Sequence, residues 1–365
     1  MSIVNRFIVS ALHLLPPESA HEVTIAALQC GFGPVAHGKD DPALAQRLWG
    51  LDFPNFLGLA AGFDKNAQAL LPLLRMGFGF VEAGTVTPRP QEGNPRPRIF
   101  RLPRQRALIN HLGFNNIGLE AFTANLHAFR ERGVTPGLVG ANISQNKGAT
   151  PDGDFADYVA GMKAVAALAD YVVVNISSPN TPGLRGLQNK QDLAALIARV
   201  KEARASAVRQ PPLLVKISPD LDEQGRQDIA DVALATGLDG LVVSNTTVSR
   251  SPELPASMVN QPGGLSGAPL FDASTQLLAD MYRLTHGQVP MIGAGGVGNG
   301  AQAYAKIRAG ASLVQLYTAL IYKGAGLVGQ IKHDVAELLR RDGYGSIQDA
   351  VGADHRAVVA ATKAR

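Results

Sequence analysis

The stretch YVVVNISSPNTPGLR, residues 171–185, joins a strand pattern to a group of reactive polar side chains. Its first four residues are aromatic or β-branched and apolar, as is typical of a buried strand. The strand then opens into two amides and two hydroxyls, followed by prolines and a glycine that favour a loop: Asn175, Ser177, Ser178 and Asn180. Active sites of parallel α/β proteins lie where strands end, so this segment indicates both a fold class and a site.

Other apolar segments repeat this design along the chain. We predict eight strands, at residues 56–59, 78–83, 138–143, 171–176, 213–217, 240–244, 290–294 and 313–317. Helical patterns lie between most of them, for example at residues 192–204, 223–236 and 299–309. This alternation predicts an α/β fold, a closed (β/α)₈ TIM barrel, with a doubly wound open sheet as the alternative. The long segment at residues 84–137 is expected to carry function.

The composition excludes several classes of protein. The 365 residues are 46% apolar and 18% charged, which supports a large core and excludes a disordered chain. Cys30 is the sole cysteine, so neither an intrachain disulfide nor a cysteine-rich metal site is possible, and we predict no metal. The net charge is only +4 and the basic residues are scattered, so we expect no nucleic-acid partner, while anionic small ligands remain possible.

The N-terminal segment is apolar but short. As a helix, residues 7–15 would measure about 14 Å, against a hydrocarbon core of about 30 Å, so they cannot span a membrane. Two prolines end this segment, and Ser19 with Glu22 forms a capping-box pattern for a second helix from residue 20 to about residue 30. The resulting hairpin either packs on the main domain or lies on a lipid surface and admits a lipid-soluble molecule.

The residues that follow the predicted strands share one chemistry. They are glycines, hydroxyls, amides and two lysines with almost no acids, a set that favours an anion and a polar heteroaromatic ring. The glycines after the seventh strand, Gly295 and Gly296, lie where barrels commonly bind phosphate. Each residue alone has an ordinary interpretation, as a turn glycine, a solvated lysine or a loop amide. Their recurrence at successive strand ends favours a functional site.

Longer motifs extend this pattern, and with them the chain resembles the class 2, quinone-reducing dihydroorotate dehydrogenases over nearly its entire length. Besides residues 171–185, the motifs are LGLAAGFDK at 57–65, GTVTPRPQ at 84–91, GFNN at 113–116, GGLSG at 263–267 and IGAGG at 292–296. The resemblance implies oxidation of (S)-dihydroorotate to orotate in de novo pyrimidine (UMP) biosynthesis. FMN would accept the hydride, and a membrane quinone would be the final electron acceptor.

The resemblance also implies a role for individual residues. Ser178 would be the base, where soluble class 1 relatives carry cysteine. FMN would contact Ala61, Gly62, Thr85, Asn142, Asn175, Lys216, Ser244, Gly267, Gly296, Tyr317 and Thr318. The substrate would contact Lys65, Asn110, His111, Leu112, Gly113, Phe114, Asn175, Asn180, Asn245 and Thr246. His111 stands where the family pattern has arginine, and Ser244 stands where it has threonine.

The N-terminal hairpin would form the quinone tunnel with the barrel, near His21 and Arg101. We therefore divide the chain into a helical membrane-associating domain (1–44), an FMN-binding barrel (45–345) and a weakly amphipathic helical tail (346–365). A peripheral membrane protein is expected, on the cytoplasmic face of the inner membrane if the source is bacterial. Because residues 1–40 supply no strand-end group, a chain that begins near residue 41 should still be reduced by dihydroorotate.

Three alternatives are open at this point. Lys216 at the end of the fifth strand could form a Schiff base in a barrel lyase. The chain could also be a non-catalytic peripheral membrane module with a vestigial barrel. Within the resembled family, it could be a soluble enzyme that uses fumarate or NAD, although Ser178 and the hairpin both favour quinone.

Overall fold

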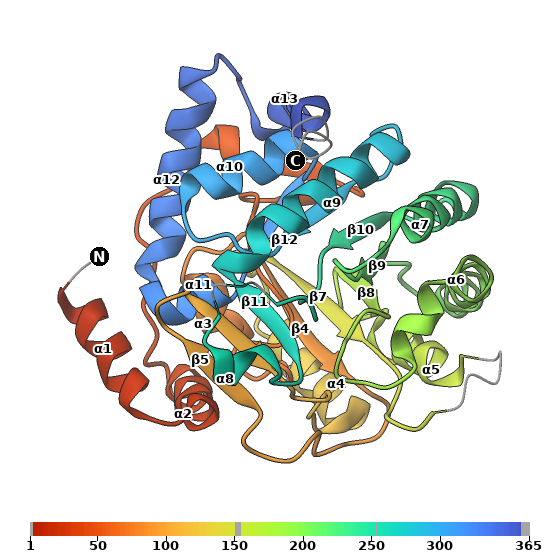
Figure 1. Cartoon of the computed structure of the whole chain (residues 1–365), viewed down its shortest axis with the longest axis horizontal. Coiled ribbons are helices and arrows are strands. Elements are labelled where there is room, and N and C mark those ends of the chain that lie inside the picture. The colour runs from red at the N-terminus through yellow and green to blue at the C-terminus, as the bar shows by residue number, and fades with distance from the viewer. Residues whose placement is uncertain (1–2, 150–154, 251, 253, 359–365) are drawn as a thin grey trace.

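The computed structural model describes residues 3–149, 155–250, 252 and 254–358 (Figure 1). Eight parallel strands close into a barrel in the order β10-β12-β13-β3-β4-β7-β8-β9. Their bounds are β3 (Leu57–Leu59), β4 (Phe80–Val86), β7 (Leu138–Ile143), β8 (Tyr171–Asn175), β9 (Leu213–Ile217), β10 (Gly240–Val243), β12 (Met291–Ala294) and β13 (Leu313–Leu316). The closing pair sets Val314 of β13 beside Leu57 of β3, so the closed barrel is confirmed and the open sheet is wrong.

Helices surround the barrel and cover the outer face of its strands (Figure 1), while side chains from the strands fill its interior. Every residue of β4, β8 and β9 is buried, as expected for parallel strands covered by helices. The helices are α3 (Leu70–Arg75), α4 (Gly118–Arg130), α5 (Ala156–Val165), α6 (Lys190–Ala205), α7 (Glu223–Thr236), α9 (Phe271–Leu284), α10 (Gly300–Ala309), α11 (Thr318–Lys323) and α12 (Gly326–Arg341). Local signals set their ends: Asn189 caps α6 by accepting the Asp192 N–H, and α7 stops at Gly237, whose φ is 58°.

Two small sheets lie at opposite ends of the barrel. The hairpin of β1 (Gln46–Leu48) and β2 (Leu51–Phe53) covers the ends at which the strands begin, where the ring of Phe53 packs 5.5 Å from that of Phe80. At the other end, β5 (Ile99–Leu102), β6 (Ala107–Asn110) and β11 (Gly264–Gly267) form an antiparallel sheet. This second sheet was not predicted from the sequence. The short helix α8 (Ala256–Val259) precedes β11 along the chain.

The N-terminal hairpin consists of α1 (Ile3–Leu14) and α2 (Pro17–Gln29). The predicted capping box is wrong: α2 begins at Pro17, and no side chain caps it. A proline already suits the first helical position, and Glu22 instead pairs with Arg96 at 2.7 Å. In the described part of the chain, no helix has the length and apolar character needed to cross a membrane.

The C-terminal segment packs on the barrel as far as the structure describes it. The short helix α13 (Ile347–Ala350) buries both of its end residues, and Arg308 of α10 pairs with Asp354 at 2.6 Å. Residues 359–365 of the predicted tail lie outside the described residues. The described part of the tail is therefore tied to α10 by burial and by an ion pair.

Candidate functional site

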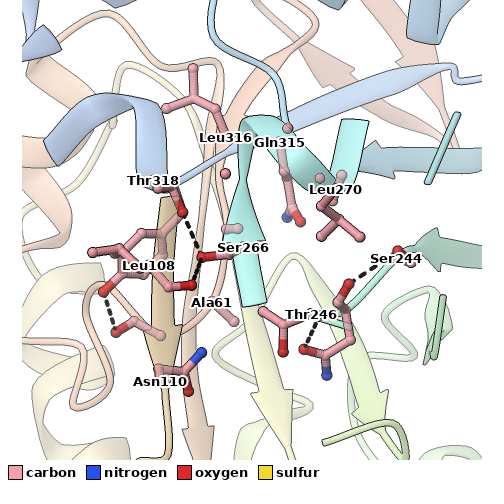
Figure 2. Close-up of a pocket in the computed structure, with 18 of the residues that line it drawn as sticks. Ala61, Leu108, Asn110, Ser244, Thr246, Ser266, Leu270, Gln315, Leu316 and Thr318 are labelled. Carbon is pink, nitrogen blue, oxygen red and sulfur yellow. Dashed lines mark hydrogen bonds between the residues drawn. The ribbon is translucent and has the colours of Figure 1, made fainter. Parts of the chain in front are cut away.

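A pocket opens at the ends of the barrel strands, beneath the sheet of β5, β6 and β11 (Figure 2). Most of the predicted site residues line it: Ala61, Gly62, Lys65, Thr85, Asn110, Leu112, Gly113, Phe114, Asn175, Ser178, Asn180, Lys216, Ser244, Asn245, Thr246, Gly267, Gly296, Tyr317 and Thr318. Four predicted residues do not line it: Asn142, His111, His21 and Arg101. The strand-end pattern thus converges on one pocket.

Amide and hydroxyl side chains form a continuous network across four strand ends. The Thr85 hydroxyl donates to Asn142 Oδ1 at 2.6 Å and accepts from Asn175 Nδ2 at 3.0 Å. The amide of Asn245 donates to Asn175 Oδ1 at 3.3 Å and to Ser177 Oγ at 3.0 Å. Asn142 therefore contacts Thr85 on the side away from the pocket. The network fixes the orientation of the amides that face the pocket.

A buried carboxylate lies below this network, inside the barrel. Glu82 is fully buried and accepts from Asn142 Nδ2 at 2.7 Å and from Gln315 Nε2 at 2.6 Å. Lys216 is 6% exposed; burial lowers its pKa, while the charge of Glu82 opposes that shift. Gln315 also lines the pocket, although it was not predicted from the sequence. The sequence did contain a signal for this residue, because Gln315 is the one polar residue in the strand LVQL.

Ser178 lies in the loop after β8 and is 6% exposed. Its Oγ accepts the backbone N–H of Asn180 at 3.2 Å. The Asn180 side chain reaches across to β6, donating to Asn110 O at 3.1 Å and to Asn110 Oδ1 at 3.0 Å. His111 contacts the same amide through Nδ1, 3.2 Å from Asn180 Oδ1. The Ser178 loop and the end of β6 are thus held together by Asn180.

Lys65 reaches the pocket from the loop after β3. Asp64 shapes that loop by accepting the backbone N–H groups of Gln68 at 2.8 Å and Ala69 at 2.7 Å. Burial lowers the pKa of Lys65 to about 8, and the nearby carboxylate of Glu18 opposes the shift. Lys65 can therefore supply a positive charge to an anionic ligand at neutral pH.

Two glycines give the pocket a backbone surface that no other residue type could form. Gly296 has a φ of 76°, and a Cβ there would lie 2.5 Å from Phe271 Cα. Gly267 has a φ of 93°, and a Cβ there would lie 2.3 Å from Arg106 O. Backbone without side chains can approach a phosphate closely. At this end the pocket lining is thus glycine backbone whose conformation other residue types disfavour.

Hydroxyl and basic side chains complete that end. Ser266 Oγ lies 2.8 Å from Thr318 Oγ1 (Figure 2), and Lys323 Nζ donates to Gly298 O at 2.7 Å. Lys323 and Arg106 line the pocket together with Lys65 and Lys216, and none of the described lining residues is acidic. The pocket thus suits an anionic ligand. The sequence assigned no role to Arg106 or Ser266, because the first lies in the turn before β6 and the second lies on β11, and neither strand was predicted.

The wall toward the N-terminal hairpin is more apolar. Ile99, Leu108 and Tyr322 line it. The Tyr322 hydroxyl donates to Ala107 O at 2.7 Å, and its ring packs edge-on against His13 of α1 at 5.5 Å. One side of the pocket is therefore shared with the hairpin.

His21 and Arg101 lie between the N-terminal helices and the barrel. The ring of His21 packs edge-on against Phe63 at 5.4 Å, and Phe63 packs against Tyr317 at 5.6 Å. Burial lowers the pKa of His21 to about 3, with a smaller contribution from the charge of Lys65, so its imidazole is neutral. Arg101 donates to the last carbonyls of the first helix and the turn after it, those of Leu12, His13 and Leu15 at 3.3, 3.1 and 2.9 Å.

Known proteins are similar to this chain in sequence and in architecture. A family profile described as dihydroorotate dehydrogenase matches residues 43–339. The dihydroorotate dehydrogenase (quinone) of Rhodospirillum rubrum is 54% identical over 94% of this chain and 92% of its own. The mitochondrial dihydroorotate dehydrogenase (quinone) of Mus musculus is 48% identical over 94% of this chain and 88% of its own.

Solved structures agree with the sequence relatives. The crystal structure of the Eimeria tenella dihydroorotate dehydrogenase in complex with ferulenol superposes with a TM-score of 0.90 at 41% identity. The alignment covers 95% of this chain and 99% of that chain. The matched family oxidises dihydroorotate in pyrimidine biosynthesis, with flavin chemistry. On sequence, fold and site together, this chain belongs to the dihydroorotate dehydrogenase family.

Proposed function

We propose that this protein oxidises (S)-dihydroorotate to orotate with FMN as the hydride acceptor and passes the electrons to a membrane quinone. The observation that carries the proposal is the pocket itself. A buried hydroxyl, Ser178, lies at the mouth of a closed barrel among amides and lysines, and the other end of the pocket is lined by glycines, hydroxyls and basic side chains. Relatives that are about half identical over nearly the whole chain carry the quinone-dependent name.

The glycine and hydroxyl end of the pocket supports FMN as the flavin. Gly267, Gly296 and Thr318 would hold its phosphate, and Lys216 would lie at the flavin end. The remaining proposed contacts are Ala61, Gly62, Thr85, Asn175, Ser244 and Tyr317, with Asn142 acting through Thr85. When bound, FMN supplies the hydride-accepting chemistry that no side chain can supply.

The amide-rich end of the pocket supports a planar anionic substrate. Lys65 would bind the carboxylate, and the amides of Asn110, Asn175, Asn180 and Asn245 would bind the ring carbonyl and N–H groups. Leu112, Gly113, Phe114 and Thr246 would surround the ring. The proposed contact of His111 is indirect, because its ring bonds Asn180 and its residue lies outside the pocket lining.

Ser178 would take the proton from C5 of the substrate. A serine is a weak base at its ordinary pKa, so its oxygen needs a donor and a dry site. The Asn180 N–H is such a donor at 3.2 Å, and the low exposure of Ser178 limits water. Asn180 would then position both the substrate ring and the base.

Exposed apolar side chains on the hairpin support a membrane-bound quinone. Residues 7–35 carry more than half of the exposed large hydrophobic side chains of the described chain: Phe7, Ile8, Leu14, Leu15, Val23, Phe32 and Val35. A reversible contact with a lipid surface would cover them. The quinone would approach beside His21 and Arg101, and the protein would be peripheral, on the cytoplasmic face of the inner membrane in a bacterium.

The visible spectrum of the purified protein tests this proposal. It should be yellow with about one FMN per chain, and dihydroorotate should bleach the flavin when oxygen is absent. A protein that gains no flavin absorbance on addition of FMN would contradict the proposal. The Schiff-base alternative makes a different prediction, namely that borohydride traps substrate on Lys216.

A further inference from the structure

Ion pairs join helix α2 to residues 96–98, on the substrate side of the pocket: Glu18 pairs with the buried Arg98 and also with the exposed Arg96, at 3.2 Å. Glu18 of α2 accepts three hydrogen bonds from Arg98: from Nη2 at 2.6 Å and from Nε at 3.1 and 3.2 Å. Both side chains are largely buried, with 13% of Glu18 and 6% of Arg98 exposed. A buried, bidentate pair of this kind has a fixed geometry, unlike a solvated surface pair.

Arg98 also organises the loop that precedes β5. Its Nη1 donates to the carbonyls of Glu92 at 2.6 Å and Asn94 at 2.7 Å. Its own carbonyl accepts the backbone N–H of His111 at 2.7 Å. The arginine thus holds residues 92–98 in one conformation and binds the chain at the end of β6.

Asn94 carries this organisation to the residues proposed to bind substrate. Its backbone N–H donates to Leu112 O at 2.9 Å, and its Nδ2 donates to His111 O at 3.1 Å and to Asn180 O at 3.5 Å. The contact is tight, because a Cβ on Gly113 would lie 2.8 Å from Asn94 Nδ2. Continuous contacts therefore run from Glu18 through Arg98 and Asn94 to the residues around Ser178.

We propose that Glu18 is a positioning residue for dihydroorotate oxidation, acting through Arg98 and Asn94 on residues 110–113 and on Asn180. Helix α2 is then part of the substrate site as well as of the quinone approach. The identity of the ligand in this inference rests on the proposed function. The chain of contacts from Glu18 through Arg98 and Asn94 does not depend on it.

The charges around the pair support the same conclusion. Without Glu18, the guanidinium of Arg98 would be buried and unpaired, which is costly. The charge of Glu18 raises the pKa of Lys65, whereas the charge of Arg98 lowers it. Loss of Glu18 would thus weaken the proposed carboxylate site through the geometry that Arg98 maintains.

The test compares Glu18→Gln with Glu22→Gln in the full-length holoenzyme. Glu22 is the matched control because it lies on the same helix and pairs with Arg96, which is 58% exposed. Glu18→Gln should raise the orotate Kd, read from the flavin spectrum, on the order of tenfold and slow flavin reduction by dihydroorotate. Glu22→Gln should change both by less than about twofold. Quinone oxidation of dithionite-reduced enzyme should be unchanged in both variants.

Hydrogen exchange separates this inference from the proposed function. In the ligand-free holoenzyme, the amides of His111 and Asn94 should exchange faster in Glu18→Gln than in wild type or Glu22→Gln. The double variant Glu18→Met/Arg98→Met should lose less orotate affinity than the sum of its single variants, since neither charge is left unpaired. Unchanged exchange and unchanged orotate affinity in Glu18→Gln would overturn the inference, as would a defect confined to quinone oxidation. If these amides exchange faster in Glu18→Gln but dihydroorotate does not reduce the flavin of the wild-type protein, the positioning role of Glu18 would stand and the proposed function would be wrong.

Discussion

At Ser178, the proposed chemistry depends on one oxygen and one donor. Ser178→Ala should retain FMN and bind orotate, but its flavin should be reduced about 10²–10⁴-fold more slowly, the usual cost of losing a positioned base. Ser178→Cys should be partly active because a thiol can also take the proton. Rapid mixing with dihydroorotate without oxygen measures this rate. A wild-type rate in Ser178→Ala would exclude Ser178 as the base.

The lowered pKa of Lys65 predicts how ligand binding depends on pH. Burial lowers its pKa to about 8, and among its charged neighbours Glu18 and Asp64 oppose the shift, Arg98 adds to it, and Glu22 opposes it least. Below that pH, Lys65 of the free enzyme is protonated and carries the positive charge that binds a carboxylate. Above that pH, Lys65 must take up a proton before the carboxylate can bind. The orotate Kd should therefore rise by up to tenfold per pH unit above about pH 8.

A titration of orotate affinity between about pH 7 and pH 9 measures this effect. Lys65→Met should bind orotate weakly and lose most of the pH dependence. An orotate Kd in wild type that stays flat or falls across this range would contradict the assignment of Lys65.

Single residues show what a sequence can and cannot place. Their positions after predicted strands were enough to predict that Ser178 and Lys65 lie in the same pocket. Position alone could not tell which way a side chain points, and Asn142 contacts Thr85 on the side away from the pocket instead of facing the pocket. Gln315 was missed because it precedes the strand end and was read as part of an apolar strand.

Among the structural elements, the glycine loop after β12 has a steric constraint that a single substitution can test. Gly296→Ala should lose most of its FMN, because the new Cβ would meet the Phe271 backbone at 2.5 Å and the φ of 76° disfavours alanine. Gly186→Ala is the control, since its φ is not positive and no atom lies within 4 Å of its Cβ. Flavin content and riboflavin-versus-FMN affinity measure the outcome. Normal FMN affinity in Gly296→Ala would remove this loop from the phosphate site.

The hairpin makes a prediction of its own about membranes. Phe7→Glu/Leu14→Glu should reduce binding to lipid vesicles on the order of tenfold or more, since these side chains are 72% and 87% exposed. Val208→Glu is the control, on a fully exposed residue far from the hairpin in the sequence. Flavin reduction by dihydroorotate should be unchanged in both. Equal sedimentation of all variants with vesicles would show that the hairpin does not bind lipid.

Elements differed in how well the sequence specified them. All eight barrel strands could be predicted because each is a short, mainly apolar segment and helical patterns lie between most of them. The sheet of β5, β6 and β11 could not, because its short strands are partly exposed and β11 pairs with β6 from 154 residues away, as Asn110 and Gly264 show. The capping box failed because Pro17 begins the helix two residues earlier than Ser19.

In the whole molecule, the proposed function has one barrel mouth serve two ligands that would approach from different sides. The apolar wall at Tyr322 faces the hairpin, while the amides around Ser178 lie under residues 92–114. The sequence suggested that these functions separate cleanly, because residues 1–40 supply no strand-end group. The Glu18–Arg98 pair changes that expectation, and a chain starting at residue 41 should keep FMN but bind orotate more weakly.

The most direct test of the account is a double-mixing experiment on the full-length protein. Dihydroorotate first reduces the bound flavin without oxygen, and the reduced enzyme is then mixed with a quinone, with fumarate or with NAD. The account predicts bleaching in the first step and rapid return of the flavin absorbance with quinone alone. Absence of bleaching by dihydroorotate, or reoxidation by fumarate or NAD as fast as by quinone, would contradict it.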